Sequence, residues 1–526
     1  MATITALVCW ALFFIAAVRK FSHVLQAERY HTNAYLGWAL KGGGARVYMT
    51  GKYEGAVHLF ALASFAMLPR FPREASWALA VCALAWAAPN LRPEKNAKKP
   101  LVYTARVKRL FIAVLVIYAV PLAVAWTAMG RDALILCVVA LGYLAPLLVA
   151  GGNIATSPVE MALQSGFKRE ARKRLKGKTV VAITGSYGKT GTKEAVAHLL
   201  ETSFPLLKTP GSFNTPMGLC KVINDSLEPG HEMFVTEMGA TRKGDIRELC
   251  EIAPPSVGII TSVGTAHFET FGSEGNVAKA KFELADALPP DGLLIYNADY
   301  PLAREKAKGR PQKTVTYSLD HPADFTPLNI RCDENGSTFD IKTPTGLVEG
   351  VRIRPLGRLN ALNVTAAFAV GAHFKIPLDR LARSAATLAQ TPARMELLEN
   401  PGSYLIINDG FNSNPVGAAS ALETLSLFTG RKKFLVTPGL VDLGEMHDLA
   451  NFEFGKKAAG HCDWVLLVNE RRTRPIYDGL LSAGFDSERL RVFPSLASAR
   501  AFLDKTADKN GVALFENDLP DHMETF

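Results

Sequence analysis

Long apolar runs near the N-terminus constrain the fold of this chain more than any other feature of its sequence. Two of them, 110–129 and 133–152, contain the roughly 20 residues that a helix needs to cross a bilayer. A third, 2–18, carries no charge before Arg19. It lacks the basic start and the small-residue cleavage site of a signal peptide, so we interpret it as a retained first span.

Two shorter apolar runs, 55–69 and 75–89, are separated by a charged turn. Lys and Arg gather after the first, third and last of the five runs and are sparse in the other connections. This alternation follows the positive-inside bias and predicts a transmembrane region of about five helices over residues 1–152, with the N-terminus outside. If the two short runs form a re-entrant hairpin instead of two spans, the chain still returns to the cytoplasm, so the predicted sides of the membrane do not change. Buried helices of a soluble core are the alternative to spans.

We therefore expect a multi-pass protein of the cell (inner) membrane, in contact with the lipid bilayer, with its later domains in the cytoplasm. Residues 153–178 are polar, basic and helical in pattern, which predicts a juxtamembrane linker at the membrane surface. The net charge of +10 is explained by these basic residues, so nucleic acid is not an expected partner. The seven cysteines include no C-x-x-C pair, which argues against a zinc site or a disulfide framework.

The pattern changes at residue 179 to that of an α/β fold. The β-branched run 179–184 is typical of a strand that is buried on both faces, and a glycine-rich turn and a helical pattern follow it. Strand-like runs then alternate with helical segments, which predicts a mostly parallel sheet in a central ATP-binding domain, 179–355. Short strands around 316–356 are expected to be antiparallel. A second alternating region predicts a Rossmann-like C-terminal domain, 356–526.

The turn after the first strand, TGSYGKTGT, has the composition of a phosphate-binding loop. Gly185 and Gly188 let backbone N–H groups approach phosphate oxygens, and the helix N-terminus favours negative charge. Lys189 can reach the β- and γ-phosphates, and Thr190 can bind Mg²⁺. The common Walker A pattern needs a glycine where this chain has Ile183, so the loop is either degenerate or of a shorter kind. A strand–helix turn without a ligand is the alternative.

Further motifs follow in a fixed order and resemble those of the Mur ligase family, whose loop reads roughly T-G-x-x-G-K-T-x-T. The continuation Lys193–Glu194 resembles one branch in particular, the UDP-N-acetylmuramoyl-tripeptide–D-alanyl-D-alanine ligases. The resemblance covers about 179–470. The segments that carry it are GSFNTPMGL, VTEMGA, TSVGTAHFETFGS, NVAKAKFEL, NAD, GRLNALNVTAA, TPARMELLE, INDGFNSNPVG and LVDLGEMHDLANFEFGKKAA.

The resemblance implies an ATP-dependent acid–amino-acid ligase of peptidoglycan precursor synthesis, acting through an acyl phosphate and releasing ADP. ATP and two Mg²⁺ ions are the implied cofactors, and Lys281 matches a family lysine that CO₂ often carbamylates. The implied ATP-binding residues are Gly185, Ser186, Tyr187, Gly188, Lys189, Thr190, Gly191, Asn297, Asp299, Asn363, Arg394 and Asp409. The implied metal-binding residues are Thr190, Glu237, His267 and Lys281. Lys189, His267 and Lys281 are the implied catalytic residues, and Asn214, Thr215, Asn412 and Asn414 the substrate residues.

The chain departs from the family pattern where substrates would be recognised. Membrane spans stand where the soluble enzymes have a domain that grips the UDP-sugar, and Leu359 stands where a histidine is frequent. The end of the chain lacks a K-G-S-R-like segment, and its Glu516, Asp518 and Asp521 could bind an amine or cation or form a solvated tail. The carboxylate-bearing peptide or sugar-peptide and the amine, a dipeptide or amino acid, therefore stay open.

Two other functions remain alternatives at this point. A Mur-like ligase of another polymer, such as poly-γ-glutamate, would use the same chemistry on a different acceptor. A transporter or receptor with a nucleotide-regulated domain would need polar residues inside its spans, and His58 is nearly the only one.

Overall fold

The computed structural model describes residues 1–28, 30–49, 54–91, 100–211, 213–264, 271–398, 403–410, 414–441 and 443–517. The chain divides into two compact units, Met1–Ser165 and Gly166–Leu519, which are described separately. The division falls inside one continuous helix, α8, so the expected linker at 153–178 begins as part of the first unit's last helix.

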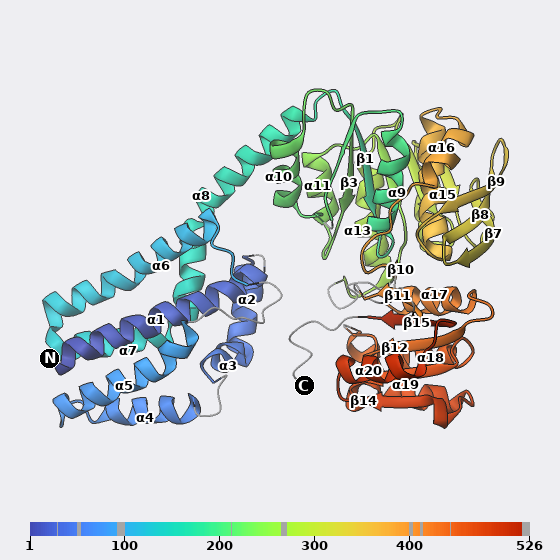
Figure 1. Cartoon of the computed structure of the whole chain (residues 1–526). Helices are drawn as coiled ribbons and strands as arrows, with labels where there is room; N and C mark the ends of the chain where they lie inside the picture. The colour runs from blue at the N-terminus through green and yellow to red at the C-terminus, as the bar shows by residue number, and fades with distance from the viewer. Residues whose placement is uncertain are drawn as a thin grey trace. The chain divides into compact units, whose positions relative to one another are not determined.

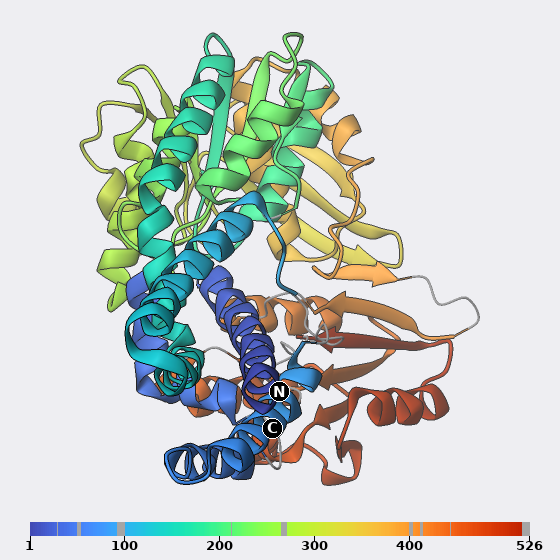
Figure 2. The same ribbon diagram turned by 90° about the vertical axis from the view of Figure 1, so that its left-hand side faces the viewer.

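The first unit is entirely helical in the residues described (Figures 1 and 2). Its core is rich in aromatic rings: Phe13 contacts Trp10, Tyr48 and Trp86. His58 lies in the same core, where its ring nitrogens contact the Tyr143 hydroxyl at 3.0 Å and the Tyr48 carbonyl oxygen at 2.7 Å. The elements are α1 (Ala2–Ala27), α2 (Thr32–Trp38), the π-helical turn η1 (Ala39–Gly43), α3 (Gly44–Tyr48), α4 (Glu54–Ala66), α5 (Pro72–Asn90), α6 (Ala105–Val124), the π-helical turn η2 (Ala125–Met129), α7 (Gly130–Tyr143) and α8 (Ala145–Arg174).

Within the described residues, two helices are long and apolar enough to cross a membrane by length and composition, Ala2–Ala27 and Ala105–Ala128. A third candidate is the pair Ala133–Tyr143 and Ala145–Arg174, which is bent by 76°. The helix at the second short apolar run, α5, does not meet the same test, and α4 is only 13 residues long. The structure therefore offers two or three candidate spans where the sequence pattern predicts about five.

The second unit contains a six-stranded sheet with the order β2-β3-β1-β4-β5-β6, and each pairing in it is parallel (Figure 1). The strands expected from the sequence are present, and the short edge strands β2 and β6 add to them. The strands are β1 (Thr179–Thr184), β2 (Leu206–Lys208), β3 (Met233–Met238), β4 (Val257–Ile260), β5 (Leu293–Asn297) and β6 (Lys313–Tyr317), and the helices between them are α9 (Lys189–Glu201), α10 (Pro216–Ser226), α11 (Asp245–Ile252), α13 (Glu274–Asp286) and α14 (Pro301–Ala307).

Both faces of this sheet are buried, as the β-branched composition of β1 predicts. Val181 and Ile183 point into one core with α9, and Val180 and Ala182 point into another with α10, α11, α13 and α14. Successive side chains of a strand alternate between faces, so one strand supplies both cores.

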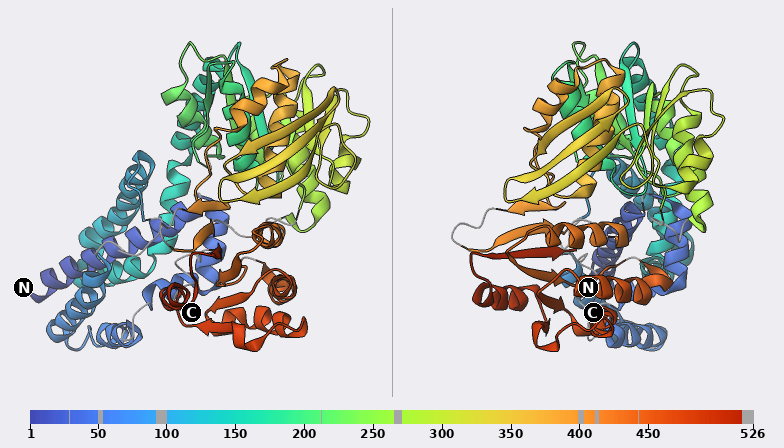
Figure 3. Two further views of the ribbon diagram at one scale, coloured as in Figure 1. Left: turned by 45° about the vertical axis from the view of Figure 1, so that its right-hand side comes forward. Right: turned by 90° about the vertical axis from the view of Figure 1, so that its right-hand side faces the viewer.

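The antiparallel strands expected around 316–356 form a three-stranded sheet, β7 (Thr326–Asp333), β8 (Gly336–Thr343) and β9 (Gly346–Ile353) (Figure 3). It shares the α9 core with α15 (Arg358–His373) and α16 (Leu378–Ala385). The apolar residues of α15 are thus buried in the same core as α9 and the central sheet.

The last part of the chain forms a second six-stranded sheet, β10-β11-β15-β12-β13-β14, which is parallel except for the edge strand β10. α17, α18 and α19 cover one face and α20 covers the other. The elements are β10 (Glu396–Leu398), β11 (Leu405–Asp409), α17 (Pro415–Ser426), β12 (Lys432–Thr437), the 3₁₀ turn η3 (Gly444–Met446), α18 (His447–Ala459), β13 (Trp464–Val468), α19 (Glu470–Ser482), the 3₁₀ turn η4 (Ser487–Arg489), β14 (Leu490–Phe493), α20 (Leu496–Thr506) and β15 (Gly511–Glu516).

Two basic residues at the end of α8 and in the turn after it bind to the central domain. Lys168 forms a 2.6 Å ion pair with Glu248, and Lys178 donates to the carbonyl oxygen of Pro229 at 3.1 Å. Ala171 and Leu175 are buried in the core that α10 and α11 share. The end of α8 and the turn after it are thus part of the second unit's packing.

Candidate active site

Parallel strands direct their carboxyl ends to one edge of a sheet, which is where ligands of such sheets bind. β1 lies between β3 and β4, and its Ile183 is in register with Glu237. The loop after β1, Glu237 near the end of β3, Thr261 just after β4 and Asn297 at the end of β5 therefore meet at this edge.

Two glycines shape the phosphate loop for different reasons. A side chain at Gly185 would place a Cβ atom 2.0 Å from Thr261 Oγ1, so only glycine fits between β1 and β4. Gly188 has a φ of +80° and precedes the first residue of α9, a conformation that other L-residues rarely adopt. The loop backbone is thereby fixed by its own glycines and by the Ser262 hydroxyl, which accepts from the Tyr187 N–H at 2.7 Å.

Lys189 opens α9 and lies across the loop. Its ammonium donates to the carbonyl oxygens of Gly185 at 2.7 Å and Ser186 at 3.2 Å. Burial lowers the pKa of Lys189; the charge of Glu237 opposes this shift and that of Arg394 adds to it. A phosphate bound to the loop would offer this half-buried cation an anionic partner that the two carbonyls cannot supply.

Glu237 forms the centre of a group of oxygen ligands. Its Oε2 accepts from the Thr190 hydroxyl at 2.8 Å, and its Oε1 accepts from the Asn214 amide at 3.0 Å. Its side chain is buried, with 1% exposure. A carboxylate and a hydroxyl side by side are the hard oxygen donors that Mg²⁺ prefers, so these residues fit the implied ion.

One further residue expected to bind the metal, His267, and two expected to bind substrate, Thr215 and Asn412, lie elsewhere or outside the described residues. Thr215 uses its hydroxyl to cap α10, where it accepts from the Gly218 N–H at 3.3 Å. His267 and Asn412 lie outside the described residues. Across the described ranges, His, Cys, Asp and Glu side chains form no group of three or more that could hold a metal.

Lys281 lies on α13 and is almost completely buried, with 2% exposure. Burial, assisted by the charge of Lys189, lowers its pKa to about 7, against the opposing charges of Asp245 and Glu283. Near neutral pH a large fraction of this amine is therefore unprotonated, whereas a solvated lysine would be fully charged.

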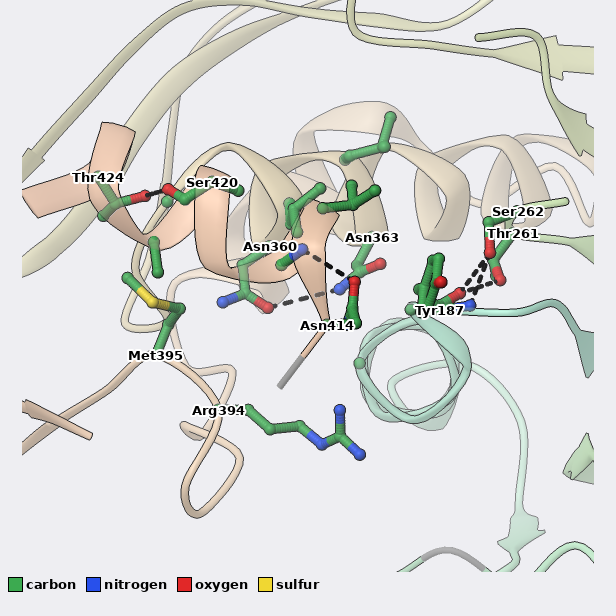
Figure 4. A pocket seen from close by; sticks show the side chains of 18 of the residues that line it. Tyr187, Thr261, Ser262, Asn360, Asn363, Arg394, Met395, Asn414, Ser420 and Thr424 are labelled. Atoms are coloured by element: carbon green, nitrogen blue, oxygen red, sulfur yellow. Dashed lines mark hydrogen bonds between the residues drawn. The ribbon is translucent and has the colours of Figure 1, made fainter. Parts of the chain in front are cut away.

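A pocket opens beside the phosphate loop, between the central sheet and the C-terminal sheet (Figure 4). Its empty volume, open solvent included, is about 1000 Å³. Arg394 extends into this space in Figure 4. Of the residues expected to bind ATP or substrate, those lining the pocket are Tyr187, Gly188, Gly191, Asn297, Asn363, Arg394, Asp409 and Asn414.

Several lining residues were missed by the sequence analysis. They include Thr261, Ser262, Tyr300, Leu356, Asn360 and Met395. Leu359, noted only as a departure from the family pattern, also lines the pocket. Thr261 and Ser262 follow β4 directly, so the rule that ligands bind at strand ends could have found them. Tyr300 and Met395 have no local signal, because folding alone brings their segments to the pocket.

The family model that describes the Mur ligase middle domain matches residues 183–371. The UDP-N-acetylmuramoyl-tripeptide–D-alanyl-D-alanine ligase of Synechocystis is 30% identical over 326 residues, which cover 61% of this chain and 68% of that protein. This chain belongs to the Mur ligase family.

Other Mur ligases share the same part of the chain. The Bacillus subtilis enzyme of the same name is 34% identical over 280 residues, 53% of this chain and 60% of its own length. The crystal structure of the MurF ligase from Thermotoga maritima in complex with ADP matches with a TM-score of 0.61 and 27% identity, covering 69% of this chain and 82% of that one. The chain spans about 60% and 65% of the first two curated relatives it matches.

Two residues of the Mur ligase pattern have structural partners that the sequence did not suggest. Asp299 accepts the backbone N–H groups of Leu319, Asp320 and His321 at 2.8, 3.0 and 3.1 Å, and it does not line the pocket. It therefore orders the turn after β6. Asn297 accepts from the Asp299 N–H at 2.9 Å and does line the pocket.

The C-terminal sheet brings two carboxyl groups together. Asp409 ends β11 and is in register with Glu516 of β15, which is fully buried. Burial raises the pKa of Asp409, against a hydrogen bond of 3.0 Å from the Met395 N–H, the charge of Arg394 and a hydrogen bond with Glu516. Glu516 is thus an internal strand residue and not part of a solvated tail. Asp518 and Asp521 lie outside the described residues.

Proposed function

We propose that this chain is an ATP-dependent ligase that joins a carboxylate to an amine through an acyl phosphate and releases ADP. The observation that carries the proposal is the hydrogen bond from Thr190 to Glu237. Thr190 directly follows Lys189 in the phosphate loop, and the loop lies beside the pocket. A cation for phosphate, oxygen ligands for Mg²⁺ and an open pocket then adjoin one another, and family membership supports the same activity.

The residues have distinct tasks in this scheme. ATP supplies the phosphoryl group and Mg²⁺ neutralises its charge, while the loop N–H groups orient the phosphates. Lys189 exchanges its two carbonyl partners for phosphate oxygens, and Arg394 adds a second cation from the C-terminal side. Thr190 and Glu237 hold the metal, and Asn214 keeps Glu237 in its orientation. Closely placed charges act strongly here because the site is buried.

We further propose that Lys281 acts as a carbamate that supports a second Mg²⁺, with His267 as the other candidate ligand. Only an unprotonated amine attacks CO₂, and a pKa of about 7 makes that form available. The reaction converts a buried cation into an anion, which removes the repulsion from Lys189 and creates an oxygen ligand.

For the substrates, we propose a peptidoglycan precursor, with addition of D-alanyl-D-alanine or a related lipid-linked step as the reaction. The names of the relatives support this choice. The alternative, a ligase of another polymer such as poly-γ-glutamate, is favoured by one observation. Glu516 is buried in register with Asp409, near the end of the chain that lacks the K-G-S-R-like segment, and a substrate amine would meet acidic groups there instead of basic ones.

We also propose that the first unit anchors the enzyme in the membrane as a multi-pass segment, with the catalytic domains in the cytoplasm. Only 17% of the apolar window of the Ala105–Ala128 helix is buried in the structure. Its large apolar side chains Ile112, Leu115, Val116 and Val120 are exposed. A water-soluble protein rarely exposes so continuous an apolar face, whereas lipid would cover it.

The decisive experiment measures ADP release by the full chain in detergent with candidate carboxylates and amines. Release stimulated by UDP-MurNAc-tripeptide together with D-alanyl-D-alanine supports the peptidoglycan reaction, and release with glutamate alone excludes it in favour of the other polymer. Lys189→Ala is expected to abolish ligation, and a ligating Lys189→Ala variant would refute the proposed role of the phosphate loop.

A further inference from the structure

Lys193 is a buried lysine that the proposed mechanism does not use. It lies one turn after Lys189 on α9, and its side chain has no solvent exposure. Its ammonium donates to the carbonyl oxygens of Thr209 at 2.6 Å and Gly211 at 2.5 Å, and pairs with Glu194 Oε1 at 3.1 Å. The three N–H donors of the ammonium thus each have an acceptor.

The two carbonyl groups belong to the loop between β2 and α10, the same loop that carries Asn214. Asn214 donates to one oxygen of Glu237, and Thr190 of α9 donates to the other. Glu237 is therefore oriented from two sides, by the nucleotide-binding helix and by this loop. Lys193 joins those two sides directly, through bonds that do not involve Glu237.

An apolar residue could fill the space of Lys193 but could not bind the two carbonyl oxygens. Burying an ammonium costs free energy that must be recovered from its partners. Here those partners fix the position of a loop against a helix. Its neighbouring bonds are those of the Thr209 N–H to the Val235 carbonyl and of the Gly239 N–H to the Asn214 carbonyl.

We propose that Lys193 is a positioning residue that ties the loop between β2 and α10 to the nucleotide-binding helix, and so holds Asn214 on Glu237. The inference rests on the proposed function, because Glu237 matters here as the ligand of the nucleotide-bound metal. Loss of the tie leaves Glu237 bound to Thr190 alone and free to turn, which weakens metal binding more than nucleotide binding.

The test compares Lys193→Met with Lys208→Met in the full chain in detergent. Lys208 is a matched control, because it pairs with the other oxygen of Glu194 at 2.6 Å and is 40% exposed. The readout is the affinity for ADP with and without Mn²⁺, each measured by equilibrium titration. We expect Lys193→Met to bind ADP alone with the affinity of the wild type. The factor by which Mn²⁺ raises the affinity for ADP should be about tenfold smaller than in the wild type, as is typical when a residue that orients a metal ligand is removed.

The outcomes separate this inference from the function on which it rests. A folded Lys193→Met variant that keeps the wild-type Mn²⁺-dependent gain overturns the inference alone. A wild-type chain without such a gain overturns the proposed function and the inference with it. If circular dichroism shows that Lys193→Met is unfolded, Asn214→Ala replaces it, since this variant leaves Lys193 and its carbonyl partners in place. An unchanged gain in Asn214→Ala then overturns the inference.

Discussion

The hydroxyl of Thr192 donates a hydrogen bond of 3.0 Å to Oδ1 of Asn363, which joins α9 to α15. Thr192 is fully buried, and a Cβ atom at its neighbour Gly191 would lie 2.4 Å from the Asn363 amide nitrogen. Asn363 also lines the nucleotide pocket. One side chain thus connects the phosphate loop helix with the helix that leads to the C-terminal domain.

Replacement of Asn363 by alanine is expected to destabilise the chain and to weaken ADP binding. The buried Thr192 hydroxyl would lose its acceptor, which costs about 1–3 kcal/mol. Thermal unfolding and ADP titration measure the two effects. Thr192→Val serves as the partner in a double-mutant cycle, and the pair should cost less than the sum of the single changes. Additive costs would show that the bond contributes nothing.

Replacement of Glu237 by glutamine should raise the Mg²⁺ concentration for half-maximal ADP release by about tenfold or more, because the side chain loses the charge that attracts a hard divalent cation. Glutamine keeps one acceptor oxygen, so the variant should remain folded. Glu232→Gln is the control, since Glu232 directly precedes β3 and is exposed. An unchanged Mg²⁺ requirement in Glu237→Gln would exclude Glu237 as a ligand.

Lys281 should make activity depend on pH and on bicarbonate. At a fixed concentration of dissolved CO₂, ADP release should rise with pH through about 7, where the amine loses its proton. Lys281→Arg cannot form the carbamate and should be inactive with or without bicarbonate. Wild-type activity that is unaffected by removal and return of bicarbonate would contradict the carbamate.

The same lysine should affect stability with a defined sign. Its pKa is about 7 in the folded chain against an ordinary value of 10.5, so between these values the unfolded chain binds a proton that the folded chain does not. The contribution of this group to the free energy of unfolding therefore rises with pH across that window. Lys281→Met should unfold at a higher temperature than the wild type at pH 7. This difference in unfolding temperature should become smaller as the pH is raised. An identical pH dependence in both chains would refute the lowered pKa.

Removal of residues 1–165 should release the protein from membranes. The full chain should sediment with membranes and require detergent, because the candidate spans expose apolar side chains. The shortened chain, which begins at the second unit, should stay in the supernatant and give a cooperative thermal transition. A full chain that is recovered without detergent would contradict the membrane anchor.

The local parts of the site were predictable from the sequence because each depends on neighbouring residues. The run 179–184 is a strand, and Gly188 adopts the positive φ that its loop requires. The edge strands β2, β6 and β10 were missed, because they are only partly buried and none is the continuous apolar run that marks the central strands.

The sequence by itself determined the phosphate loop, the parallel α/β architecture and the family pattern, because strand burial and glycine geometry are written in adjacent residues. Tertiary structure alone decided what the distant residues do. It placed Asn214 on Glu237, directed Asp299 to a turn, and buried Glu516 against Asp409. It also buried Lys281, whose lowered pKa depends on the removal of water and on Lys189. Such effects arise from packing between segments far apart in the chain, and no local pattern encodes them.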